Sequence, residues 1–159
     1  MSRRAVIAAL CVLFAGPAAA QDGAPFEANP DGDYLPDPRR DLPLDEAELR
    51  AAFTDKTHIG SYNFRRRDID TFAFEETTTS DGRTVHTHGD KTDRGTWRVL
   101  SNVICFEYVD WDGPGGIHRA CFNIFQKGNC YYHYAIRGGG FTARSFHEGE
   151  QPVCEPGYV

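Results

Sequence analysis

Apolar and polar residues alternate along most of the chain after Lys56, which is the period of a half-buried β-strand. Short stretches rich in Gly, Asp and Asn interrupt this alternation and mark turns. The pattern predicts eight strands: Thr57–Phe64, Ile69–Thr77, Arg83–Gly89, Arg94–Leu100, Val103–Asp110, Ile117–Phe125, Cys130–Arg137 and Phe141–His147. Because their connections are short, we expect a mainly β fold, an antiparallel meander or a small barrel of about eight strands.

The two strands on either side of residues 111–116 predict a hairpin. That connection contains three Gly residues and a Pro, so it can do little except turn. Folding the chain about Gly113 places Cys105 opposite Cys121. Directly opposed residues on antiparallel strands have the separation that a disulfide needs. The hairpin therefore predicts a Cys105–Cys121 disulfide. The fifth cysteine, Cys11, lies in the N-terminal apolar run described below, so Cys130 is left to pair with Cys154.

The same register sorts side chains onto two faces of the sheet. One face, the predicted core, carries Trp97, Val99, Ile104, Phe106, Tyr108, Ala120, Phe122 and Ile124. The other carries Arg98, Cys105, Glu107, Arg119 and Cys121. For the strand that begins at Cys130 two choices stay open, with either Tyr132-Tyr134-Ile136 or Tyr131-His133-Ala135 pointing inward. The first set is more apolar but requires an odd-length or bulged turn.

One short helix is predicted before the strands. Asp45 can cap it and Glu48 completes a capping box, while Leu44 can pack on Leu49 as a hydrophobic staple. Leu49, Ala52 and Phe53 then form a single apolar stripe. We expect this helix to lie against the sheet or to plug an opening in it.

The first 20 residues have the pattern of a secretory signal peptide. Arg3 and Arg4 precede an uncharged apolar run, and Ala18-x-Ala20 offers a cleavage site. The apolar run is too short to span a bilayer. We therefore expect a signal peptide at 1–20, a Pro-rich extended or disordered leader at 21–43 and a single β-rich domain at 44–159. Export to the periplasm or beyond also suits a chain with two disulfides.

Charge excludes one class of partner. Without the signal, 15 basic residues face 23 acidic ones, a net charge of about −8. Such a chain is not expected to bind nucleic acid, and it has no general attraction to an anionic membrane.

One ordered pattern runs through the middle of the chain: Gly95-Thr-Trp-Arg-Val99, then the paired-cysteine hairpin, then Cys121-Phe-Asn-Ile-Phe125. With this pattern the sequence resembles a family of small exported bacterial proteins classed as a domain of unknown function. The opening of the family, a Leu-rich helix and a Thr-His step, matches 49–58. The resemblance implies an exported β-rich domain and supplies no catalytic residues. Glu148-Gly149-Glu150 departs from the Glu-Gly-Asn expected there.

His86, His88 and Asp90 are the candidate metal ligands. Alternate residues of a strand share a face, so two imidazoles and a carboxylate could converge on zinc or copper. The competing interpretation is a polar, solvent-facing strand surface. A further ligand would have to come from another histidine.

Two other features are candidate partner contacts. Arg65, Arg66 and Arg67 form a basic cluster on an acidic chain and could hold phosphate or carboxylate groups, although such a run is also typical of a solvated turn. Trp111 lies at the Gly-rich hairpin tip, where an exposed aromatic ring could contact a partner.

The sequence favours binding over catalysis. It has no Gly-x-Ser-x-Gly elbow and no phosphate-binding Gly loop before a helix, so we expect no enzyme activity and no cofactor. The favoured function is a non-catalytic binding protein of the cell envelope, with an envelope component or another protein as partner. The alternatives are an inhibitor of a protease or lysozyme and a metal-binding protein that uses the His-x-His-x-Asp strand.

Overall fold

The computed structural model describes residues 26–28, 36, 41–66, 69–109, 116–138 and 140–154. It contains one helix, α1 (Glu46–Phe53). The strands are β1 (Phe26–Ala28), β2 (Lys56–Tyr62), β3 (Phe64–Arg66), β4 (Ala73–Thr78), β5 (Arg83–His88), β6 (Lys91–Leu100), β7 (Val103–Val109), β8 (Ile117–Lys127), β9 (Cys130–Ala135) and β10 (Gly140–His147).

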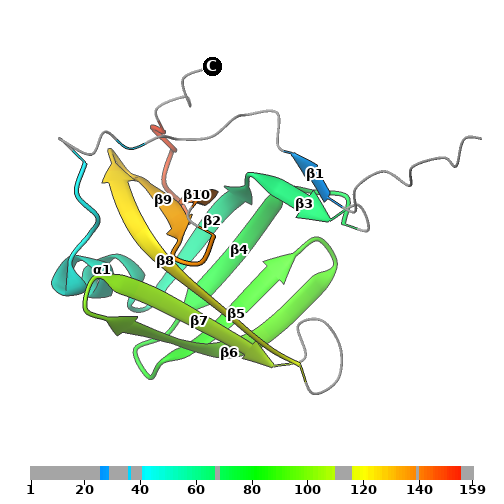
Figure 1. The fold of residues 1–159 in the computed structure, drawn as a ribbon, viewed down its shortest axis with the longest axis horizontal. Coiled ribbons are helices and arrows are strands. Elements are labelled where there is room, and N and C mark those ends of the chain that lie inside the picture. The colour runs from blue at the N-terminus through cyan, green and yellow to red at the C-terminus, as the bar shows by residue number, and fades with distance from the viewer. Residues whose placement is uncertain are drawn as a thin grey trace, which may run out of the picture.

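Eight of these strands form a closed antiparallel barrel. β2 and β4 to β10 follow one another around it in chain order, and β10 closes the ring by pairing with β2. β1 and β3 pair separately as a small two-stranded ribbon, which Figure 1 shows beside the barrel. The predicted mainly β fold, with about eight barrel strands and one short helix, is confirmed.

Several predicted boundaries, and the assignment of the arginine cluster to a turn, were wrong. β4 begins at Ala73 rather than Ile69, and β6 begins at Lys91 rather than Arg94. Arg65 and Arg66 lie in β3 rather than in a turn, because the segment 64–66 pairs with 26–28. The sequence of the leader carries no strand signal, so this pairing could not be anticipated.

The central hairpin has the predicted register. Cys105 lies opposite Cys121 and Glu107 opposite Arg119. Both predicted disulfides are formed, and the Cα atoms of Cys105 and Cys121 are 4.1 Å apart. The second disulfide ties Cys154, beyond the last strand, to the first residue of β9.

The open choice on β9 is settled by its turn. Lys127 pairs with Cys130 across a two-residue connection in which Gly128 has a φ of 58°, so Tyr131 and His133 point inward. Tyr132, on the outer face, is nevertheless buried, because a second cluster covers it. That cluster contains Cys130, Phe141, Phe125, Tyr134 and Cys154.

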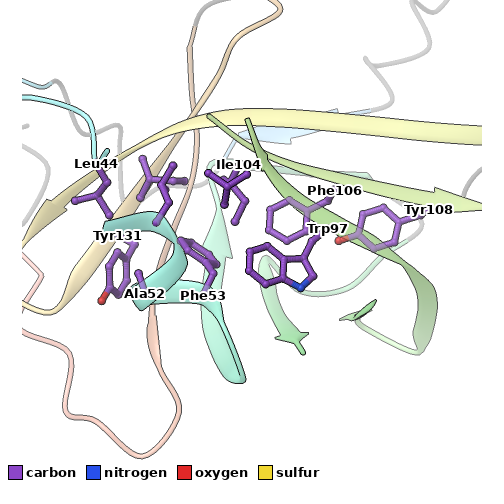
Figure 2. Packing of buried hydrophobic residues seen from close by; sticks show 11 residues of the cluster. Leu44, Ala52, Phe53, Trp97, Ile104, Phe106, Tyr108 and Tyr131 are labelled. Atoms are coloured by element: carbon purple, nitrogen blue, oxygen red, sulfur yellow. The ribbon is translucent and has the colours of Figure 1, made fainter. Parts of the chain in front are cut away.

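α1 closes one end of the barrel. Its capping box forms as predicted, with the Asp45 and Glu48 side chains each accepting from the other's backbone N–H. Leu49 and Phe53 are fully buried. In Figure 2, Phe53 lies between Tyr131 on one side and the rings of the barrel core on the other. The apolar stripe thus acts as a plug rather than as a cover for the outer face of the sheet.

Candidate functional site: the barrel interior

Every histidine of the chain lies on the inner face of the barrel. Two residues that lie directly opposite each other on neighbouring strands point to the same face of the sheet, and so do residues two apart on one strand. Each histidine is related in one of these two ways to a residue that points inward. The six are His58, His86, His88, His118, His133 and His147. His58, His86, His88 and His133 are buried. Such a concentration of imidazoles makes the interior far more polar than an ordinary apolar core.

One polar network centres on the carboxylate of Glu76. The side chain is buried, and its carboxylate accepts hydrogen bonds from the hydroxyls of Thr84 and Tyr108, the latter at 2.5 Å. Nδ1 of His86 lies 2.8 Å from the same carboxylate. The other ring nitrogen of His86 lies 3.3 Å from the hydroxyl of Tyr62. A buried carboxylate needs such donors, since burial without them would be costly.

The Glu76 carboxylate determines which of its neighbours donate a proton in this network. Because the Glu76 carboxylate can only accept, Nδ1 of His86 carries a proton and donates it. Nε2 of His86 is hydrogen-bonded to the Tyr62 hydroxyl, and either atom can supply the proton. The Tyr108 hydroxyl proton points to the Glu76 carboxylate, within the wall of the barrel.

A second network joins His58, Ser145 and His133. Ser145 is fully buried, and its Oγ lies 3.1 Å from Nδ1 of His58 and 2.8 Å from Nε2 of His133. Nε2 of His58 donates to the Ala52 carbonyl at 3.1 Å, so in the neutral ring Nδ1 accepts the single Ser145 proton. His133 must then donate through Nε2. Its Nδ1 keeps a lone pair.

Burial sets the charge of these rings. Desolvation lowers the pKa of His58 to about 3, and the same cause lowers that of His133 to about 3. Desolvation also lowers the pKa of His88. Burial and the nearby Glu76 carboxylate raise the pKa values of Tyr62 and Tyr108. These three imidazoles and both phenols are therefore uncharged at neutral pH.

A cavity of about 1080 Å³ extends from the barrel interior to the end away from α1. Phe53 of α1 borders its inner end, and Arg65, Lys91 and Gly138 border its mouth. Inward residues that line it include Tyr62, Phe74, Glu76, His88, Asp93, Phe106, Tyr108, His118, Ala120, Phe122, His133, Ala135 and Ala143. Part of the volume lies outside the barrel, because outer-face residues such as Arg98 also border it.

The predicted metal ligands do not come together. His86 and His88 face the interior, with ring centroids 6.3 Å apart, while Asp90 is exposed in the turn after β5. His86 binds Glu76 and Tyr62, and Nε2 of His88 donates to the Thr71 carbonyl at 2.9 Å. Within the described residues, no group of three or more His, Cys, Asp or Glu side chains is arranged to hold a metal ion.

The other predicted contact residues are also separated. Arg65 borders the cavity mouth, its guanidinium lies 5.1 Å from the centre of the Phe72 ring, and Nη1 donates to the Ile69 carbonyl. Arg66 belongs to β3. Arg67 and Trp111 lie outside the described residues, and so does most of the hairpin tip on which the inhibitor hypothesis depends.

The inward histidines were not recognised from the sequence as one group. Strand alternation alone shows that His86 and His88 share one face of a strand. Showing that all six histidines point into the barrel requires the register of all eight barrel strands.

Comparison with protein-family models, curated proteins and solved structures finds no match. The resemblance to small exported proteins therefore stays a prediction, and function has to be argued from the barrel itself. In the part of the chain that the structure describes, no helix is long and apolar enough to cross a membrane.

Proposed function

We propose that this protein is an exported, non-catalytic binding protein of the cell envelope that holds a small ligand inside its barrel. The signal-peptide pattern and the two disulfides support export. The observation that carries the proposal is the cavity, which α1 bounds at one end and which opens at the other. Eight strands are enough to enclose one small ligand, and ligand sites are typically concave, aromatic-lined and provided with a few polar groups.

Binding without catalysis fits the polar groups inside the barrel. Ser145 has an imidazole on each side, but its hydroxyl is fully buried and does not line the cavity. The four cysteines near the barrel are oxidised in pairs and supply no thiolate. The interior networks hold the strands together and shape the wall.

Filling the cavity should abolish binding. Ala120 of β8 is inward-facing and lines the cavity, so the side chain of an Ala120→Trp variant would project into the cavity and fill part of it. We expect binding of the neutral fluorescent probe N-phenyl-1-naphthylamine to fall at least about tenfold, a loss of about 1.4 kcal/mol. The measurement is a fluorescence titration of wild type and variant.

Ala73→Trp is the matched control, because Ala73 is exposed on β4 and does not line the cavity. This variant should bind the probe as wild type does. A wild-type protein that fails to bind the probe, or an Ala120→Trp variant that binds it equally well, would contradict a ligand site in the barrel.

A further inference from the structure

The inner wall of the cavity presents hydrogen-bond acceptors. Nε2 of His88 donates to the Thr71 carbonyl and Nε2 of His133 donates to Ser145, so in each neutral ring Nδ1 is left with a lone pair. Neither Nδ1 has a hydrogen-bond partner among the described residues. Both histidines line the cavity.

Donor groups on the same wall are turned away from the cavity. The Tyr108 hydroxyl donates to Glu76, and the Tyr62 hydroxyl is hydrogen-bonded to Nε2 of His86. A ligand that needs protons from the protein would have to break these bonds, which leaves a buried group unsatisfied. A ligand that brings its own N–H groups would not.

Two carboxylates, those of Glu76 and Asp93, and one lysine, Lys91 at the mouth, occupy inward positions of the barrel strands. Glu76, His86 and Asp93 lie directly opposite one another on β4, β5 and β6, so the imidazole stands between two carboxylates. Asp93 is half-buried and lines the cavity, and it has no hydrogen-bond or ion-pair partner among the described residues. Five basic side chains also border the cavity, at its mouth or outside the barrel: Arg65, Lys91, Arg98, Arg119 and Arg137. All of these except the half-buried Arg65 are exposed to solvent, where water and salt screen their charge.

Aromatic rings supply the rest of the wall. Phe74, Phe106 and Phe122 line the cavity, and the faces of such rings attract cations as well as apolar groups. The net negative charge of the chain also favours a positively charged ligand over an anion during approach.

We propose that the cavity binds organic ammonium compounds, with an aromatic or other apolar body among the phenylalanine rings and the ammonium group at Asp93. The proposal rests on the proposed function, since it needs a ligand inside the barrel. Asp93 supplies the opposite charge, and the imidazole nitrogens of the inner wall accept hydrogen bonds from N–H groups.

Three probes share the same naphthalene ring and differ in the charge of its substituent, so they separate the effect of ligand charge on affinity from that of ligand shape. They are 1-naphthylmethylammonium, 1-naphthylmethanol and 1-naphthoate. We expect the ammonium probe to bind at least about tenfold more tightly than the alcohol, and the carboxylate to bind most weakly. Isothermal titration calorimetry with the disulfide-bonded protein at pH 7.5 measures all three.

Asp93→Asn tests the assigned residue, and Asp90→Asn is its control. Both variants remove one negative charge from the same region, but Asp90 is exposed and does not line the cavity. Asp93→Asn should remove most of the preference for the ammonium probe and leave binding of the alcohol unchanged. Asp90→Asn should change neither.

The outcomes distinguish the two proposals. Equal binding of the ammonium probe and the alcohol, or an Asp93→Asn variant with the wild-type preference, would overturn the ammonium proposal while the barrel remains a binding site. Binding of none of the three probes would overturn both. Urea unfolding of each variant shows whether a lost preference reflects a lost fold.

Discussion

Acidification from pH 7 to pH 5 should remove roughly 4 kcal/mol from the free energy of unfolding through His58 and His133 alone. The reason is that both imidazoles are buried and neutral in the folded barrel. The pKa of each is about 3 in the native state and 6.5 when the chain is unfolded. Between these values the unfolded chain binds protons that the folded chain does not.

The sign follows from this difference. A state that binds more protons gains stability as pH falls, so the folded barrel loses stability below pH 6.5 and continues to lose it until about pH 3. Each residue contributes up to about 1.4 kcal/mol per pH unit in this range. Because small domains are stable by only about 5–15 kcal/mol, the barrel should unfold in mild acid.

Urea unfolding at several pH values, followed by the fluorescence of buried Trp97, measures the effect. His133→Asn keeps a donor for Ser145 but does not titrate, so its stability should depend on pH about half as steeply between pH 6 and pH 4. Above pH 8 the plots of unfolding free energy against pH for wild type and His133→Asn should run parallel, because the His133 imidazole is then neutral in the folded and in the unfolded chain. A wild-type stability that does not change from pH 7 to pH 5 would contradict neutral burial of these rings.

Removing the plug should be the most damaging single substitution. Phe53 is fully buried, and its ring lies parallel to that of His58 with centroids 4.2 Å apart. It also contacts Phe106 and Tyr131, at centroid distances of 6.4 and 5.9 Å. Phe53→Ala removes this packing and leaves a cavity at the closed end of the barrel. The expected loss is about 3–5 kcal/mol in the free energy of unfolding.

The urea midpoint of Phe53→Ala, compared with that of wild type, checks this expectation. Leu42→Ala serves as the control, because Leu42 is 80% exposed and its truncation should change stability by less than about 0.5 kcal/mol. A loss of less than about 1 kcal/mol for Phe53→Ala would show that α1 does not seal the barrel.

Local signals in the sequence were enough to predict much of the fold. A capping box and an apolar stripe place α1, and a Gly-rich turn with equidistant cysteines sets the register of β7 and β8. These features work because each depends on residues close together in the chain. The hairpin register also predicted the core face through Trp97 and Phe106, both of which are buried.

The chemistry of the interior could not be predicted in the same way. His-x-His on β5 suggested a metal site, but each of these imidazoles uses ring nitrogens to bind groups from β2, β4 or the loop before β4. Those partners are distant in sequence, and only closure of the barrel brings them together. Glu76 has no distinctive local pattern, although it anchors the larger network. The ribbon of β1 and β3 was missed for the same reason.

The central claim is that His58, His88 and His133 are neutral, with the ring proton on Nε2 and a lone pair on Nδ1. Long-range ¹⁵N–¹H correlation NMR of ¹⁵N-histidine-labelled protein at pH 7.5 tests it directly, because it distinguishes the two neutral tautomers from the charged ring. We predict the neutral Nε2–H tautomer for His58, His88 and His133. A charged ring or the Nδ1–H tautomer at His88 or His133 would contradict the account.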